Sequence, residues 1–187
     1  MKSTGKCLVI VVAMALAFYA VNGWLSIEGN AAAQAQRSER PIEDAVLRYL
    51  QEERLNYTRV RDGVYRIQYS DVNFSTRFVV YEEMDRLMVL AQMDEKVPAS
   101  HRPAVIEYLT RINYGLIIGN FEMDLSDGEV QFRVSVDVEH VGINTKKIGQ
   151  MLGIAIHNAD RFAPGIEELS KGRTPEDIYN EIIRRRD

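Results

Sequence analysis

Residues 100–138 constrain the fold of this chain more than any other stretch, because their period changes from helical to strand-like. The first part recurs at helical spacing after Ser100, which is placed to cap a helix. This helical face consists of Val105, Ile106, Leu109, Ile112, Asn113 and Leu116. Further on the period is two, and Ser126-Asp127-Gly128 supplies a hairpin turn between two alternating segments. Their inward residues are Phe121, Met123 and Leu125, then Val130, Phe132, Val134, Val136 and Val138. The pattern predicts a helix beside an antiparallel hairpin, in a sheet covered on one face and solvated on the other.

Helices flank the runs of strands along the rest of the chain. The patterns predict a helix at 41–54, strands at 57–60, 64–69, 73–81 and 86–93, a helix that Asn144 caps and Pro164 breaks or restarts, and a last helix at 176–186 that Thr174 caps. Both faces of segment 86–93 are apolar, so we expect a central strand there. The order α-β-β-β-β-α-β-β-α-α is typical of the α+β class, with helices packed on one face of an antiparallel sheet.

The N-terminal segment has the features of an export signal. Lys2 and Lys6 precede an uncharged apolar run at 8–21, and Ala33-Gln34-Ala35 has the small-x-small pattern of a cleavage site. We therefore expect residues 1–35 to be a secretory signal peptide. The alternative is an uncleaved anchor, because the apolar run extended to Leu25 approaches the roughly 20 residues that span a bilayer. Both interpretations place the domain outside the cytoplasm, either in the periplasm or secreted. The protein would contact the membrane only through this segment, and only if the segment is not cleaved.

The remaining chain predicts a polar linker at 36–40 and a single domain at 41–187. The 23 basic and 27 acidic residues give a net charge of −4, which argues against a nucleic-acid surface because such a surface needs a basic excess. The one cysteine, Cys7, lies in the predicted signal peptide. Cleavage would therefore leave a domain without disulfides or thiol chemistry.

The segment 111–124, Arg-Ile-Asn-Tyr-Gly-Leu-Ile-Ile-Gly-Asn-Phe-Glu-Met-Asp, resembles the YbjN family, whose fold is similar to that of type III secretion chaperones. In it a helix ends in a turn that contains Asn113, and a glycine-bearing strand rich in large apolar residues follows. The resemblance continues through the Asp-Gly hairpin and the helix from Asn144, and covers roughly residues 41–162. It implies a regulatory or chaperone-like binding module, with no active site to carry over. The predicted export signal departs from the family, whose better-known members look cytoplasmic.

The sequence contains no pattern typical of a catalytic or metal site. His101, His140 and His157 have spacings that match no metal motif, so we expect solvated or packing roles for them. The paired carboxylates Glu43-Asp44, Glu82-Glu83 and Glu167-Glu168 are expected to be exposed and solubilising. Gly149 and Gly153 predict a helix backbone that approaches the sheet closely, with a dimer face as the alternative. We predict no catalytic residue, no metal and no cofactor.

Two surfaces are candidates for partner binding. One is the tyrosine-rich early hairpin with Tyr57, Tyr65 and Tyr69, because tyrosines are favoured at interfaces; the alternative is that these rings belong to the core or its rim. The other is the solvated sheet face, from which we select Gln131 and Arg133. That face also includes Glu122, Asp124, Ser135 and Asp137.

Together these observations predict an exported, non-catalytic protein-binding or chaperone-like regulatory module. Its partner, an unknown protein, would meet a sheet edge or an apolar groove between the sheet and the helices. A homodimer is also compatible with the pattern. The first alternative is a ligand-binding protein or an enzyme with a site assembled from scattered polar residues. A closed pocket with converging ionisable groups would support this alternative. The second alternative is a structural envelope protein.

Overall fold

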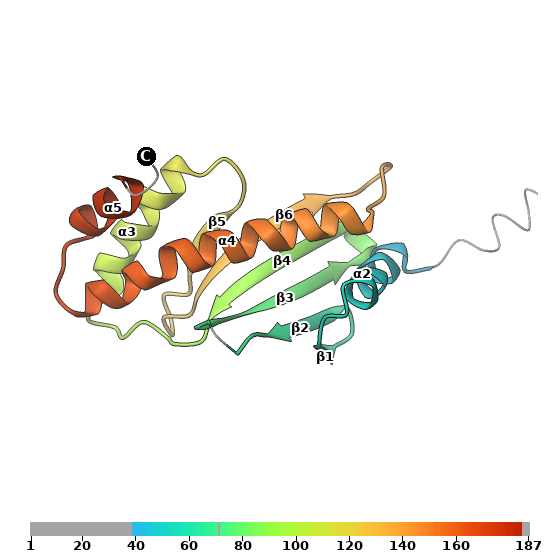
Figure 1. Ribbon diagram of the computed structural model, residues 1–187, viewed down its shortest axis with the longest axis horizontal. Coiled ribbons are helices and arrows are strands. Elements are labelled where there is room, and N and C mark those ends of the chain that lie inside the picture. The colour runs from blue at the N-terminus through green and yellow to red at the C-terminus, as the bar shows by residue number, and fades with distance from the viewer. Residues whose placement is uncertain (1–38, 71, 185–187) are drawn as a thin grey trace, which may run out of the picture. The chain divides into compact units, whose positions relative to one another are not determined.

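Alternating apolar residues build a six-stranded antiparallel sheet in the computed structural model, which describes residues 39–70 and 72–184 (Figure 1). The strands are β1 (Tyr57–Arg61), β2 (Val64–Gln68), β3 (Phe74–Tyr81), β4 (Arg86–Met93), β5 (Asn120–Met123) and β6 (Val130–Asp137). The helices are α2 (Pro41–Glu52), α3 (Arg102–Gly115), α4 (Thr145–Ser170) and α5 (Pro175–Arg184), with a short 3₁₀ turn η1 (Glu82–Met84). The strand order β1-β2-β3-β4-β6-β5 places β4 centrally, as expected from its two apolar faces. The α+β class with helices on one face of an antiparallel sheet is confirmed.

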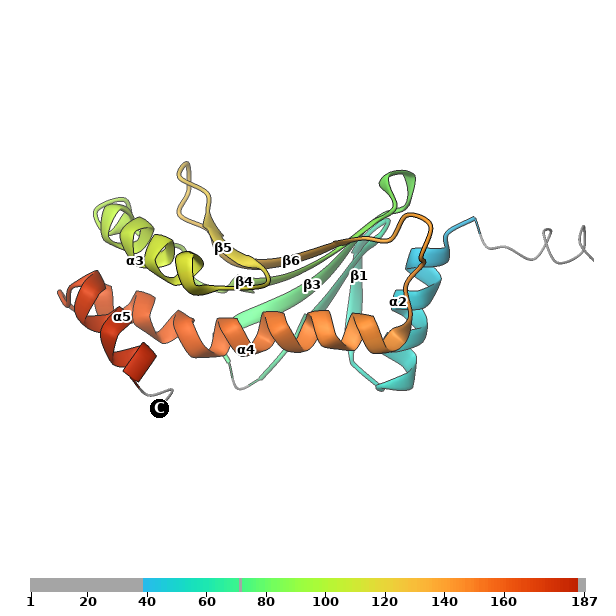
Figure 2. The same cartoon turned by 90° about the horizontal axis from the view of Figure 1, so that it is seen from above.

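Helix α4 runs along one face of the sheet and buries the inward side chains of β3, β4 and β6 (Figure 2). Phe78, Leu87 and Phe132 are fully buried in this layer. Helix α2 packs near the N-terminal end of α4, and α3 and α5 pack together near its C-terminal end (Figure 2). The opposite face of the sheet carries no helix of the described part of the chain.

Helix α4 continues through Pro164, so the predicted break there is wrong. The buried residues on both sides of the proline, Ala159, Phe162, Gly165 and Leu169, belong to one apolar face. Burying this continuous face offsets the roughly 3 kcal/mol that an interior proline costs a helix. The helix ends before Gly172, whose φ of +86° only glycine adopts readily.

Ser100 does not cap α3, contrary to expectation. The helix begins at Arg102 with His101 at the N-cap position, and no side chain caps it. A serine cap at position 100 would need the N–H groups of residues 102 or 103, and Pro103 has none. By contrast, Asn144 caps α4 as predicted, because its Oδ1 accepts a hydrogen bond from Lys147 N–H at 2.9 Å. Thr174 likewise accepts from Asp177 N–H at 3.2 Å.

The predicted signal peptide, residues 1–35, and the linker up to residue 38 lie outside the described residues. Arg40, the last residue of that predicted linker, is ion-paired with Glu43 of α2. Among the helices that the structure describes, none has the length and apolar character needed to cross a membrane.

Candidate protein-binding site

Strand β6 has an outer edge that its neighbour leaves unpaired. Strand β5 pairs with residues 130–133 only, whereas β6 continues to Asp137. Val138 N–H donates toward β4, to Asp85 O at 2.8 Å. Because the peptide groups of a strand alternate in direction, Ser135 and Asp137 point their N–H and C=O groups toward the free edge. No other described strand pairs with β6 there, so this edge can accept an added strand.

The backbone geometry at Gly119 explains why β5 pairs with only the first half of β6. Gly119 has a φ of +78°, and a Cβ atom on it would lie 2.7 Å from Phe132 Cε1 and 2.8 Å from Arg133 O. Only glycine allows the chain to cross β6 so closely while turning. The segment before Gly119 therefore leaves the edge of β6 at Arg133.

The outer edge of β5 is closed by a side chain of α3. Asn113 Nδ2 donates to Phe121 O at 2.9 Å, and Asn113 Oδ1 accepts from Phe121 N–H at 2.8 Å. The carboxamide thus takes the place of a neighbouring strand at this position. Consequently, the second half of β6 is the accessible edge on this side of the sheet.

A groove of about 570 Å³ lies between this free edge and α4. Its apolar walls are formed by Ile118, Val134, Val136, Met151, Gly153 and Ile154, and its polar rim includes Ser135, Lys147, Gln150, His157 and Asn158. A Cβ atom added to Gly153 would meet no atom within 4 Å, so the glycine widens the groove. Apolar walls with a polar rim match the composition of protein-binding surfaces.

The loop from α3 to β5 extends the apolar surface beside the groove. Tyr114 is 94% exposed, Ile117 is 97% exposed and Ile118, which lines the groove, is 52% exposed. Adjacent large apolar side chains at such exposure mark an interaction surface more often than a folding requirement.

The spacing of Gly149 and Gly153 predicted a close approach of α4 to the sheet, and this prediction is wrong. Neither glycine faces the sheet closely. Gly149 accommodates the Tyr49 ring of α2, with Tyr49 Cε2 3.1 Å from the position of a Cβ atom. The close approach is therefore between two helices. Gly153 instead faces the groove, which gives the pair two separate roles.

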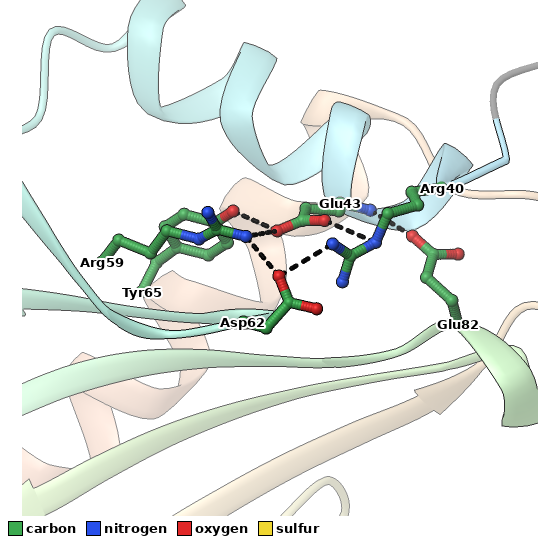
Figure 3. Close-up of polar contacts among 6 residues, drawn as sticks. All are labelled: Arg40, Glu43, Arg59, Asp62, Tyr65 and Glu82. Atoms are coloured by element: carbon green, nitrogen blue, oxygen red, sulfur yellow. Dashed lines mark hydrogen bonds and ion pairs between the residues drawn. The ribbon is translucent and has the colours of Figure 1, made fainter.

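An ion cluster around the buried carboxylate of Glu43 joins α2 to the β1–β2 hairpin (Figure 3). Glu43 is only 5% exposed and accepts a hydrogen bond from the Tyr65 hydroxyl. Arg40 Nε lies 2.7 Å from Glu43 Oε2, and Arg59 Nη2 lies 3.6 Å from Glu43 Oε1. Both guanidinium groups also pair with Asp62. The two guanidinium groups balance the charges of Glu43 and Asp62, and their contacts join separate elements, which indicates a structural role.

The cluster changes the interpretation of two carboxylates and one tyrosine. Glu43 is buried rather than exposed, and half-buried Glu82 accepts from Glu43 N–H at 2.6 Å, which caps the start of α2. Burial raises the pKa of Glu82 against the lowering effect of this hydrogen bond. Burial and the hydrogen bond to Glu43 raise the pKa of Tyr65 to about 12. Neither carboxylate is the solubilising surface residue that the sequence suggested.

The predicted binding residues do not form one site. Tyr65 is 2% exposed and belongs to the core, so its ring is not available to a partner. Tyr57 packs edge-on against it at 5.8 Å between centroids, and Tyr69 lines a separate hollow of about 450 Å³ with Leu55 and Ile156. These three rings lie on the helix-covered side of the sheet.

Gln131 and Arg133 lie on the opposite, open face of the sheet. Gln131 Nε2 donates to Glu122 Oε1 at 3.2 Å, and Arg133 Nη2 lies 3.1 Å from Glu122 Oε2. Sequence reasoning missed the groove residues Val136, Gly153 and Ile154. One signal was present, because the second predicted strand of the hairpin is longer than the first and must leave part of its edge unpaired.

The described residues do not bring the histidines together. His101 lies at the start of α3, His140 in the loop after β6, and His157 on the rim of the groove. No group of three or more His, Cys, Asp or Glu side chains in 39–70 and 72–184 is placed to hold a metal ion. A second hollow, of about 90 Å³ and including Lys96 and Glu167 in its lining, is much smaller than the few hundred Å³ of a usual ligand site.

The chain is similar to several solved structures. YbjN from E. coli is 14% identical with a TM-score of 0.46, over 76% of this chain and 92% of that one. The ExsC–ExsE complex is 12% identical with a TM-score of 0.45, over 65% and 90%. The HopA1–SchA chaperone–effector complex is 12% identical with a TM-score of 0.41, over 63% and 85%.

No curated protein sequence matches the chain. A family model, YbjN, described as "Putative bacterial sensory transduction regulator", matches residues 43–168. These residues include the whole sheet and nearly all of α4. Because the match spans more than half of the sequence, the chain belongs to the YbjN family.

Proposed function

We propose that this protein is a chaperone-like binding module that holds an extended segment of a partner protein along the free edge of β6. The observation that carries the proposal is the unpaired edge at Ser135 and Asp137 beside an apolar groove. Main-chain hydrogen bonds to the edge would supply affinity, and alternate side chains of the partner would enter the groove.

The dimensions of the edge define the partner segment. Residues 134–137 form the unpaired part of β6, and each strand residue advances about 3.4 Å, so a segment of roughly four to five residues fits. Its inward side chains would contact Val134, Val136 and Ile154, which favours aliphatic or aromatic residues at every second position.

Two pairs of variants test this site. Gly153→Leu fills the groove, whereas its control Gly153→Ala leaves most of it open. Ser135→Pro removes the outward N–H of the edge, and proline is tolerated at an edge position of this kind, whereas Ser135→Ala keeps the N–H. Partners would be recovered from cell-envelope extracts by each variant and identified by mass spectrometry.

We expect the two control variants to retain the partner and Gly153→Leu and Ser135→Pro to lose it. The loss of one main-chain hydrogen bond corresponds to a weakening of about threefold to tenfold. A partner that all four variants retain equally would refute binding at β6. Recovery of only a small molecule would favour the ligand-binding alternative.

We extend the proposal to export of this module to the cell envelope. The support is the uncharged apolar run at 8–21 after Lys2 and Lys6, followed by the small-x-small pattern at Ala33-Gln34-Ala35. Sequencing the N-terminus of the mature protein tests it. An N-terminus at residue 36 is expected, and protein that keeps Met1 in the cytoplasmic fraction would contradict export.

A further inference from the structure

The open face of the sheet brings arginines from separate strands into one transverse row. Arg66 of β2 lies opposite Arg77 of β3, Arg77 lies opposite Leu90 of β4, and Leu90 lies opposite Arg133 of β6. Side chains directly opposite on one face of an antiparallel pair have Cβ atoms about 5 Å apart. Arg66 and Arg77 therefore form a like-charged pair at the surface.

Arg66 and Arg77 are left without the contacts that such charges normally have. Neither has an ion pair within 4.0 Å among the described residues, whereas Arg133 is paired with Glu122. The Nε atoms of Arg66 and Arg77 are buried and have no hydrogen-bond partner, and the same holds for Gln92 Oε1 two residues beyond Leu90 on the same face. Buried polar atoms without partners are rare in folded proteins and are costly.

The environment of Arg77 opposes its charge. Burial, and after it the nearby charge of Arg66, lower the pKa of Arg77, while the charge of Glu129 acts in the other direction. Opposed like charges destabilise a sheet. The fold thus holds two guanidinium groups opposite each other, and a bound anion would reduce the repulsion between them.

An apolar patch lies next to the arginine pair on the same face. Val64 and Val79 form the adjacent cross-strand pair, and Met88 lies opposite Val79. With Leu90 these side chains form a cluster separate from the main core. Val64, Val79 and Leu90 are buried, so the partly buried Met88 is the member of this cluster that a ligand beside the arginine pair would contact.

We propose that the open face binds an acidic, extended protein segment whose carboxylates pair with Arg66 and Arg77 and which places an aliphatic side chain against Met88. Guanidinium groups bind carboxylates through two parallel hydrogen bonds, and here the terminal Nη groups would donate them because the Nε atoms are buried. This surface is on the opposite side of the sheet from the β6 groove, so the proposal goes beyond the function proposed above.

The charge pattern selects this occupant over others. Glu122 and Asp137 lie on the same face, and the chain carries a net charge of −4, so a long polyanion such as DNA or an anionic membrane would be repelled beyond the arginine pair. A second copy of the chain, stacked face to face, would bring two Arg66–Arg77 pairs together. A short segment with a few carboxylates avoids both the repulsion from the acidic side chains and the repulsion between two arginine pairs.

The test uses a synthetic peptide of about ten residues in which glutamate and valine alternate, and a matched peptide with glutamine in place of glutamate. Affinity for the full chain would be measured by calorimetry, and the contact surface by amide NMR shifts. The protein variants are R66Q/R77Q, the control R48Q on α2, and Gly153→Leu in the β6 groove.

We expect the glutamate peptide to bind, with shifts on β2 and β3, and the glutamine peptide to bind at least about tenfold more weakly. R66Q/R77Q should lose at least about tenfold in affinity without a lower unfolding midpoint, while R48Q and Gly153→Leu bind normally. The proposal is overturned if the glutamate peptide does not bind, if the two peptides bind equally, or if R66Q/R77Q binds normally. It is also overturned if duplex DNA or phosphatidylglycerol vesicles bind more tightly than the peptide.

Discussion

Two glycines inside α4 should respond in opposite ways to the same substitution. Gly153 faces open space in the groove, whereas Gly165 is buried against Tyr108 of α3 and Ile178 of α5. Neither has a positive φ, so alanine is compatible with the backbone at both positions. Replacing each glycine by alanine therefore isolates the effect of tertiary packing from that of helix propensity.

The expected magnitudes follow from the surroundings of each Cβ atom. Alanine is better than glycine in a helix interior by about 1 kcal/mol, so Gly153→Ala should raise the free energy of unfolding by that amount. At Gly165 the new Cβ would overlap Tyr108 Oη and Cζ and lie 3.0 Å from Ile178 Cγ2. Tyr108 is fully buried, and its hydroxyl donates to Phe162 O at 2.9 Å.

Displacing Tyr108 would cost about 1–3 kcal/mol for overpacking and a similar amount for its hydrogen bond. After the propensity gain is subtracted, Gly165→Ala should lower the free energy of unfolding by roughly 1–5 kcal/mol. Urea denaturation followed by circular dichroism measures both variants under the same conditions. Each kcal/mol corresponds to about 2–4 °C in the melting temperature of a chain of this size.

The decisive result is the sign of the two changes. A stabilised Gly165→Ala variant would show that the α3–α4 contact is looser than the structure indicates. A destabilised Gly153→Ala variant would show that the groove is not open at Gly153, and it would weaken the binding site proposed there. Tyr108→Phe provides a control, because it removes the hydroxyl without adding a Cβ.

Three further substitutions test the fold around the binding surfaces. Asn113→Ala removes both hydrogen bonds to Phe121 and should lower the free energy of unfolding by about 2 kcal/mol, with faster hydrogen exchange at the β5 amides; unchanged exchange would contradict its role as an edge cap. Tyr65→Phe should cost about 1–3 kcal/mol near pH 7, because Glu43 loses a buried donor. The pKa of Tyr65 rises from 10.0 to about 12 on folding, so the wild type should lose stability as the pH rises from 10 to about 12, and Tyr65→Phe should reduce this slope; an unchanged slope in alkaline denaturation curves would argue against the raised pKa. Glu82→Gln should cost about 0.5–1 kcal/mol in thermal unfolding through the weaker cap of α2, and no change would indicate that solvent caps this helix equally well.

Local periodicity predicted the elements of this fold well. The apolar patterns in 57–93 and 120–138 predicted the six strands nearly residue for residue, because one buried face forces a period of two and the central strand 86–93 is apolar on both faces. The caps at Asn144 and Thr174 were also predictable, since capping depends on residues within the same turn. The errors at Ser100 and Pro164 arose where a neighbouring proline or a long buried face overrides the local preference.

The candidate sites depended on contacts between distant residues. Arg66 and Arg77 alternate with apolar residues along their strands, but only the strand register sets the two arginines opposite each other. It showed Gly153 on a helix and Val136 on a strand, but not that the shortness of β5 opens a groove between them.

The sequence by itself determined which segments become helices and strands and which of their faces is apolar, because these properties come from neighbours a few residues apart. Only the tertiary structure decided which edges are free, which charges lack partners and which tyrosine is buried. These properties depend on the register and length of strands that pair across many residues, which no local pattern contains.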